Sequence, residues 1–247
     1  GGLRAEAMRL TVDEARRDFH RLLPSLAVRW EPAKEWVLRS SLGAGLKTPR
    51  LEEITDLPVT SVSANSPLEA DRRGNPGLRP ERSLNFEAVL ERYLDGNTGV
   101  LGANVYWRAT EDFVERRVSQ EAGRWVERPM NEGDAEHYGL ELDAKLRTDA
   151  WGLKGGTARA HLTLPRSRVK DARLGLTRPA RETPAYLLTL GHDQNMTLWK
   201  GSAGFQAQFL GPTKSVVPGE QWTRTDARIL LDLYALARLT ANLNLRL

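Results

Sequence analysis

The residues that most often carry chemistry in proteins are sparse in this chain and form no recognisable catalytic pattern. The chain has no cysteine, and its four histidines are His20, His137, His161 and His192. Their scattered positions lack the i, i+4 spacing of paired ligands on a helix, so structural or solvated roles are favoured over a metal site. Serines and acidic residues are abundant, but no G-x-S-x-G segment marks a hydrolase nucleophile. We therefore expect no catalytic residue, no metal site, no cofactor and no enzyme activity.

The composition narrows the class of protein further. The 247 residues are 40% hydrophobic and 28% charged, with a formal net charge of +4. No run approaches the roughly 18 consecutive apolar residues of a membrane-spanning helix. Lysines and arginines are spread along the chain without a basic stripe, so nucleic acid is not an expected partner. The lack of cysteine excludes a disulfide framework and thiolate metal sites.

The dominant pattern is an alternation of apolar and polar residues that recurs about eleven times. Between Tyr138 and Arg147 the even-numbered residues are apolar, whereas the odd-numbered residues include Glu141, Asp143 and Lys145. We call each such set of alternate residues a parity. The same alternation occupies residues 199–209 and 227–235. Alternate side chains of a strand point to opposite faces of its sheet. Repeated this often, the pattern predicts an all-β, antiparallel up-and-down transmembrane β-barrel with lipid outside and water inside.

Turn chemistry and alternation together divide the chain into strands and connections. The predicted strands are 2–11, 20–30, 35–46, 83–94, 99–113, 133–147, 156–168, 184–191, 197–209, 222–236 and 240–247. Short turns are expected at Glu31–Lys34, where Pro32 opens the turn, Asp95–Thr98, Asp149–Gly155, His192–Met196 and Ala237–Leu239, and long loops at 12–19, 47–82, 114–132, 169–183 and 210–221. Short turns on one side and long loops on the other are typical of an up-and-down outer-membrane barrel.

Aromatic residues cluster near the predicted strand ends. Trp30 and Trp36 flank one short turn, Trp199 follows another, and Tyr106 and Trp107 lie towards the long-loop end of their strand. Amphipathic rings favour the membrane–water boundary, so these positions predict aromatic girdles. Ordinary core tryptophans are the alternative interpretation.

The long loop from Lys47 to Arg82 is the best candidate for ligand binding, although no individual ligand residue can be assigned. It contains five prolines and is expected to pair with no strand and to lie in solvent outside the cell. Its six basic residues are balanced by six acidic ones. Most charged residues predicted to face the barrel interior are expected to pair with one another along the wall. The alternative is that they line the route of the ligand. These residues are Arg39, Glu87, Glu91, Arg108, Glu141, Asp143, Lys145 and Arg228.

Three segments, in the same order along the chain, resemble a known family. Lys47–Glu53 (KTPRLEE) resembles the "(R/K)xPxLxEL" segment of TonB-dependent outer-membrane receptors, and Asn75–Ser83 (NPGLRPERS) resembles their "NPxLKPE" segment. Asn131–Leu142 (NEGDAEHYGLEL) resembles the family's "N.G.A...GLEL" segment at the start of a strand.

The resemblance implies a receptor of the Gram-negative outer membrane, with an N-terminal plug inside a 22-stranded barrel. It implies three partners: outer-membrane lipid, an extracellular small-molecule ligand, and the inner-membrane TonB energy-transducing complex, which is reached through the missing N-terminal part. Residues 1–247 would then be a partial barrel domain of about eleven strands. The plug and signal peptide are expected to be absent. The last strands are expected to be absent too, because the family usually ends on an aromatic residue and this chain ends on Leu247.

The resemblance also implies energised uptake of a scarce ligand, with a ferric siderophore or similar metal chelate as the default cargo. Cobalamin, other metal chelates and oligosaccharides are the alternative cargoes that the resemblance implies. Haem receptors of the family place a histidine between the first two motifs, and this chain has none between Lys47 and Arg82. A passive porin-type barrel, a barrel enzyme and a soluble β-rich binding protein are the alternatives.

Overall fold

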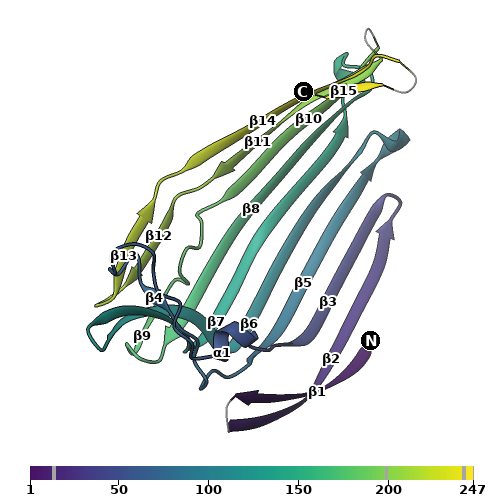
Figure 1. Cartoon of the computed structure of the whole chain (residues 1–247). Helices are drawn as coiled ribbons and strands as arrows, with labels where there is room; N and C mark the ends of the chain where they lie inside the picture. The colour runs from purple at the N-terminus through teal and green to yellow at the C-terminus, as the bar shows by residue number, and fades with distance from the viewer. Residues whose placement is uncertain (13–14, 198–199, 241–242, 247) are drawn as a thin grey trace.

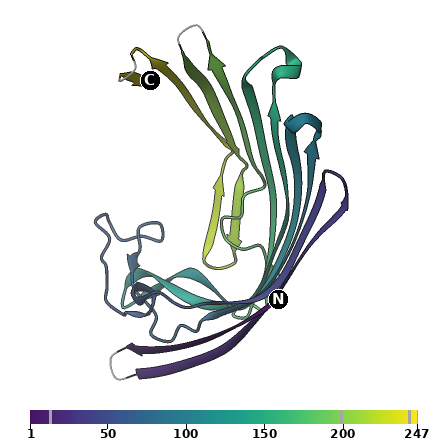
Figure 2. The same ribbon diagram turned by 90° about the vertical axis from the view of Figure 1, so that its right-hand side faces the viewer.

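The fold is a single large curved β-sheet. A computed structural model describes residues 1–12, 15–197, 200–240 and 243–246 of the chain. Eleven strands follow one another in a 13-stranded sheet, in the order β1-β2-β3-β5-β6-β7-β8-β10-β11-β14-β15. Each is antiparallel to its neighbours, which is the up-and-down arrangement that the sequence predicts. Long strands lie side by side in Figure 1, and Figure 2 shows that the sheet curves into an arc that stays open on one side.

The strands of this path have the following bounds: β1 (Gly2–Val12), β2 (Ala15–Ala33), β3 (Trp36–Lys47), β5 (Glu81–Leu94), β6 (Gly99–Glu121), β7 (Arg124–Arg147), β8 (Gly156–Asp171), β10 (Leu187–Met196), β11 (Gly201–Leu210), β14 (Arg228–Arg238) and β15 (Asn244–Arg246). Two short strands join the same sheet, β4 (Asp71–Arg72) beside β7 and β9 (Leu176–Arg178) beside β8. β12 (Thr213–Val217) and β13 (Gln221–Thr225) form a separate hairpin.

The convex face of the sheet is apolar across neighbouring strands. One continuous row of paired residues runs Leu38, Leu90, Ala103, Leu142, Leu162 and Leu188. Leu142 is 41% exposed and Leu233, near the far edge, is 71% exposed. A soluble protein would bury such a continuous surface, because exposed apolar area is costly in water. The apolar parity therefore forms an outer surface suited to lipid, as the alternation predicts.

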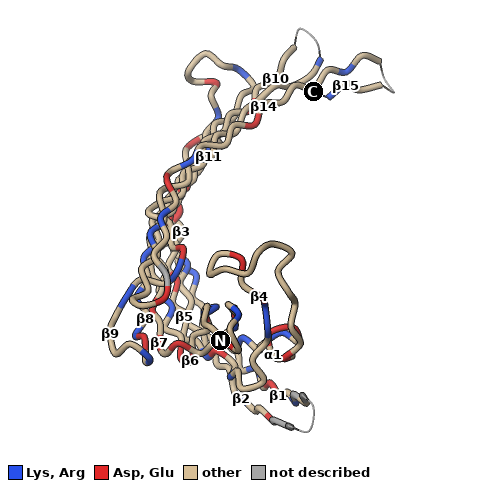
Figure 3. The backbone as a smooth tube through the Cα atoms, turned by 60° about the vertical axis from the view of Figure 1, so that its left-hand side comes forward, with Lys and Arg blue, Asp and Glu red and all other residues tan. Residues whose placement is uncertain are grey.

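The concave face is polar, and its side chains pair along the wall. Arg39 contacts Glu91 at 2.7 Å. The Asn104 amide donates to Glu87 at 2.9 Å and to Glu141 at 3.0 Å, which links three strands. Figure 3 shows acidic and basic positions interspersed along the sheet. Arg39 and Glu91 thus pair along the wall as predicted, and Glu87 and Glu141 are bridged by a neutral amide.

Consecutive aromatic residues divide between the two faces. Trp107 is paired with Phe86 and Tyr138 in the apolar parity, at the end of the sheet that carries the long loops. Tyr106 has the opposite parity and pairs with Gly139, where an added Cβ would collide with the Tyr106 ring. Trp107 therefore suits the predicted girdle and Tyr106 does not. The Trp199 position lies outside the described residues.

Several predicted connections are wrong because the strands continue past the expected membrane boundary. The predicted loop at 12–19 is a hairpin in which Val12 pairs with Ala15. The predicted loop at 114–132 is a two-stranded ribbon of β6 and β7, whose pairing reaches Glu121 and Arg124. β8 and β9 take up part of the loop expected at 169–183, and the β12–β13 hairpin takes up most of the one at 210–221. The strand expected at 222–236 is divided, because residues 222–225 belong to β13 and residues 228–236 to β14.

Three predicted short turns are also misplaced. Residues 192–196 continue β10, so the strand expected at 184–191 is Leu187–Met196. Asp193, within this extension, accepts a hydrogen bond from Tyr234 and pairs with Arg159 on the concave face. β14 extends to Arg238, into the expected turn at 237–239. Pro32, which was expected to open a turn, lies within β2 at a register shift between Trp30 and Ala33.

The assignment of the two faces predicts unequal effects of charge at adjacent positions. Leu142 faces outwards. Along β7 it lies midway between Tyr138, which pairs with Trp107, and the end of the strand at Arg147. Leu142→Arg in a complete, membrane-inserted barrel should lower the free energy of unfolding by roughly 2–4 kcal/mol. Glu141→Arg should cost much less, since position 141 lies on the wet face, within reach of Asn104. Urea titrations in lipid vesicles measure both changes, and equal losses of stability would contradict this assignment.

Candidate functional site

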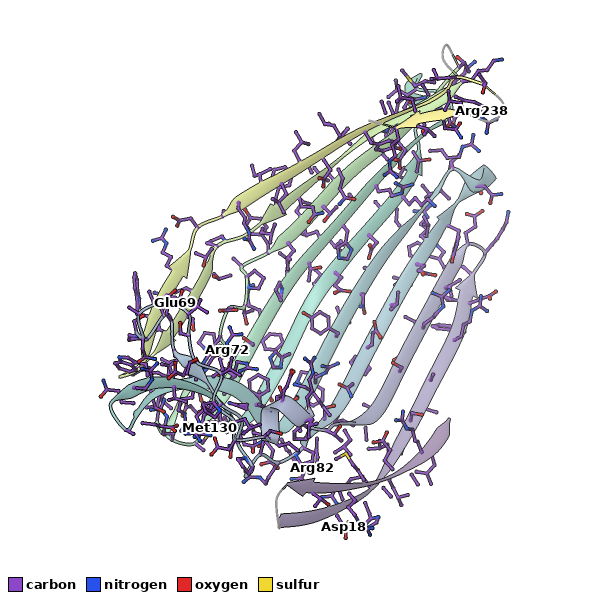
Figure 4. All side chains as sticks on the ribbon, viewed as in Figure 1. Asp18, Glu69, Arg72, Arg82, Met130 and Arg238 are labelled. Atoms are coloured by element: carbon purple, nitrogen blue, oxygen red, sulfur yellow. The ribbon has the colours of Figure 1, made fainter. Side chains whose placement is uncertain are left out.

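The candidate site is the long connection between β3 and β5, which lies on the concave side of the sheet. It contains a short helix, α1 (Leu51–Ile54), and the strand β4. Figure 2 shows it in the opening of the arc, near the end that carries the extended β6–β7 ribbon. Figure 4 labels Glu69 and Arg72 on this connection, Met130 and Arg82 at the same end of the sheet, and Arg238 at the opposite end. We call residues 57–70 the loop tip.

The segment Asn75–Ser83 anchors the connection where it returns to the sheet. Leu78 is 1% exposed. The Asn75 amide donates to the carbonyl oxygen of Pro129 at 3.1 Å, and its own oxygen accepts from the backbone of Gly77. The Glu81 carboxylate accepts from the backbone N–H of Val114 at 2.8 Å. Asn75 and Glu81 therefore satisfy backbone groups of the connection and of the ribbon.

A bulge in β6 completes this anchor. The β6–β7 register shifts between Thr110 and Phe113, and Asp112 in the shift has a φ of 57°. Its carboxylate accepts from Arg79 at 2.6 Å, and its backbone carbonyl accepts from Asn131 at 2.7 Å. Asn131 also accepts from the backbone N–H of Arg79 at 2.9 Å. The second and third sequence motifs thus meet at one point and hold the loop against the ribbon.

The loop tip is fixed to the ribbon by two further locks. The Asn65 side chain donates to the Trp125 carbonyl at 2.9 Å and accepts from the Trp125 N–H at 2.7 Å. Asp71 accepts two hydrogen bonds from Arg124, at 2.6 and 2.9 Å, and a third from the backbone of Ser61 at 3.0 Å. The hydrogen bonds from Arg124 are the main cause that lowers the pKa of Asp71 to about 2.

These contacts correct the expectation that residues 47–82 pair with no strand. Asp71 and Arg72 form β4, which is parallel to β7 through Asp71–Val126 and Arg72–Glu127. Val59 and Arg72 exchange backbone hydrogen bonds of 2.8 Å across the base of the tip. The prolines interrupt regular structure but leave enough free backbone groups for these short pairings. The segment is an ordered, docked loop.

A second cluster of buried charges lies where the sequence predicts plain loops. Arg178, 4% exposed, contacts Glu115 at 2.7 Å and Asp171 at 2.9 Å. Arg181 also contacts Glu115, at 3.3 Å, and reaches Glu220 at 2.8 Å. The cluster ties the β6–β7 ribbon to β8, β9 and the β12–β13 hairpin. Sequence reasoning missed these residues, and the available signal was the number of charged residues within 114–132, 169–183 and 210–221.

The histidines lie on four different strands. His161 contacts Asp143 at 2.7 Å and Thr163 at 2.9 Å on the concave face. His137 packs against Phe113 with ring centroids 5.2 Å apart, and His192 packs against Phe205 at 6.4 Å. Among the described residues, no group of three or more His, Asp or Glu side chains is placed to hold a metal ion. The contacts of His137, His161 and His192 are with side chains of the sheet itself.

The concave face also holds a cavity of about 860 Å³ towards the short-turn end. Its polar lining includes Glu91, Asn104, Asp143, Lys145, Arg159 and Asp193. Within the part of the chain that the structure describes, no helix is long and apolar enough to cross a membrane. The arrangement as a whole offers an apolar outer face, a polar inner wall and a docked loop.

The Asp71 lock predicts a pH dependence of the loop tip. The folded pKa of about 2 lies below the ordinary 3.8, so the lock is intact above pH 3.8 and is lost as pH falls through about 2. Hydrogen–deuterium exchange of residues 57–70, in the complete protein, should be faster in Asp71→Asn than in the parent at neutral pH. The two should converge on acidification, whereas Glu69→Gln should match the parent throughout. Equal exchange in Asp71→Asn and the parent at neutral pH would refute the lock.

Known proteins share this arrangement. The family model described as "TonB dependent receptor-like, beta-barrel" matches residues 1–247. The chain is 26% identical over 208 residues to the vitamin B12 transporter BtuB of Vibrio vulnificus (strain YJ016), covering 83% of this chain and 28% of that protein. The ferric enterobactin receptor PfeA of Pseudomonas aeruginosa superposes with a TM-score of 0.65 at 21% identity, over 94% of this chain and 35% of that one.

The FrpB iron transporter of Neisseria meningitidis (F5-1 variant) superposes with a TM-score of 0.70 at 18% identity, over 96% of this chain and 35% of that one. At these identities the two solved structures establish the fold alone. The chain spans 28% of the length of the vitamin B12 transporter and 35% of each of the two solved structures. Because the family match covers the whole chain, this protein belongs to the β-barrel family of TonB-dependent receptors.

Proposed function

We propose that this chain is part of the barrel of a Gram-negative outer-membrane receptor that takes up a scarce ligand with energy from the inner membrane. A ferric siderophore or a similar metal chelate is the proposed cargo. The observation that carries the proposal is the docked loop on the concave side of a sheet with an apolar outer face. The relatives support it, because their names describe receptors and transporters of a vitamin or of iron.

The proposed partners follow from the surfaces of the sheet. Outer-membrane lipid would cover the apolar parity, since water cannot do so without a large free-energy cost. The extracellular ligand would reach the loop tip first, because the tip lies at the end with the extended ribbon. A TonB complex would act through a plug encoded outside residues 1–247. A plug and further strands would complete the interior, where the cavity now lies open along the arc.

The proposed mechanism assigns binding to the loop and passage to the wall. The locks at Asn65, Asp71 and Asp112 hold the loop in one position before ligand arrives, so little conformational entropy is lost on binding. Hydrogen-bonded wall residues such as Asn104 keep the interior polar and hydrated. A passive porin would need the same alternation, but it would show neither ligand saturation nor dependence on the energy supply.

Removing the loop tip should separate ligand capture from barrel folding. The Val59–Arg72 bridge places the two ends of the tip side by side, so Gly-Gly can replace Thr60–Ala70 and leave β4 in place. In the complete receptor this variant should keep the heat-modifiable migration of a folded barrel, because the eleven-strand path is untouched.

Uptake of a ferric siderophore by cells that carry the variant should fall to the level of cells without TonB. The parent receptor, measured with and without TonB, is the control. Unchanged uptake in the variant would exclude the tip as the capture site, and uptake by the parent that ignores TonB would favour the passive porin.

A further inference from the structure

The loop tip has an unusual charge distribution for a surface that captures ligands. Residues 57–70 (LPVTSVSANSPLEA) contain no lysine, arginine or histidine, and Glu69 is their only charged residue. The Glu69 carboxylate lies 3.5 Å from the Ser61 hydroxyl. Anion recognition in proteins relies on arginine, lysine or clustered backbone N–H groups. The tip supplies none of these basic side chains.

The basic residues that flank the tip are already committed to carboxylates. Each of them has an acidic partner within 4 Å: Lys47 with Glu81 at 3.1 Å, Arg50 with Glu52 at 3.5 Å, Arg72 with Glu127 at 3.2 Å, Arg73 with Asp56 at 2.8 Å, Arg79 with Asp112 at 2.6 Å and Arg82 with Glu111 at 3.0 Å. An anionic ligand would compete with these carboxylates for the ammonium and guanidinium groups. The six cations of the connection are therefore poor anchors for an anion.

The tip instead presents apolar side chains to solvent. Leu57 is 70% exposed, Val59 65%, Val62 104% and Leu68 81%. The Asn65 and Asp71 locks hold this backbone in place, so the exposure belongs to an ordered surface. Covering these side chains with an apolar ligand surface would release water and favour binding.

The wall below the tip shows the same neutrality. In the cavity, Arg159 pairs with Asp193, and His161 contacts Asp143. Glu91, which also lines the cavity, pairs with Arg39. Acidic residues are at least as prominent as basic ones along this lining. A polyanion would meet no excess of positive charge on this part of the route.

We propose that the loop tip selects an uncharged ligand with an apolar surface, such as a neutral ferric trihydroxamate or a corrinoid, over polyanionic chelates. The inference rests on the proposed function and specifies its substrate class. A polyanionic chelate would lose hydration at the tip and face Glu69 without a compensating cation. A neutral chelate loses less hydration and gains the apolar contacts of Leu57, Val59, Val62 and Leu68.

The test compares three probes on the complete, purified receptor: cyanocobalamin and ferrichrome as neutral ligands, and ferric enterobactin as a polyanionic one. Titration calorimetry in detergent should detect binding of at least one neutral probe and none, or much weaker binding, of ferric enterobactin. Binding of ferric enterobactin as tight as that of either neutral probe would overturn the inference. Binding of none of the three would overturn it as well.

Two variants connect the selectivity to the tip. Leu57→Ser combined with Val62→Ser should weaken the neutral probe about tenfold, because two apolar contacts are lost. Leu153→Ser changes an exposed leucine at the short-turn end and should bind as the parent does. Heat-modifiable migration confirms that each barrel is folded. Affinity equal to that of the parent in the double variant would show that the apolar side chains of the tip do not contact the ligand, and would overturn the inference.

The outcomes separate this inference from the proposed function. TonB-dependent uptake of ferric enterobactin would leave the receptor function intact and refute neutral selectivity alone. Uptake of a neutral probe that does not depend on TonB would contradict the receptor function and leave the selectivity of the tip in place.

Discussion

Backbone hydrogen bonding in hydrocarbon is the constraint on which the rest of this structure depends. An unpaired N–H or C=O group costs several kcal/mol in lipid, so a chain without spanning helices can cross only as paired strands. Strand pairing fixes a side-chain period of two, and this period separates the Leu142 row from the Glu141 row. In the arc that the described residues form, β1 and the β14–β15 end have no further neighbour in the sheet. A barrel in a membrane needs strands that pair with these edges.

Beyond the apolar belt, the same strands serve a different purpose. β6 and β7 continue as a ribbon that water can solvate, and this ribbon becomes the support for the loop. Arg124 and Trp125 at its end hold the tip, while Asp112 and Asn131 at its base hold the returning segment. These motifs therefore have a structural explanation, since their polar side chains bind backbone groups and hold the loop against the ribbon.

The sequence predicts the interior of the strands well and their ends poorly. Alternation identifies β7 around Leu142 because lipid demands an apolar side chain at every second position. Past the membrane boundary the ribbon does not meet lipid, so no apolar side chain is required at every second position up to Glu121. Asp193 and its neighbours have the composition of a turn, yet Asp193 belongs to the wall through Arg159. The docking of the loop through Asn65 was unpredictable, because its partner is a backbone group about sixty residues away.

A scan of single spin labels along β7 tests most directly whether the apolar face of the sheet meets lipid and the polar face meets water. The chain has no native cysteine, so labels can be introduced one at a time from Tyr138 to Arg147 of the complete receptor in lipid vesicles. Collision rates with oxygen should peak at residues 140, 142 and 144, and those with a water-soluble nickel complex at 141, 143 and 145. Labels at the end of the ribbon, at residues 120–123, should respond to the nickel complex at both parities. Equal accessibility to oxygen at residues 140–145 would contradict a lipid-facing apolar surface.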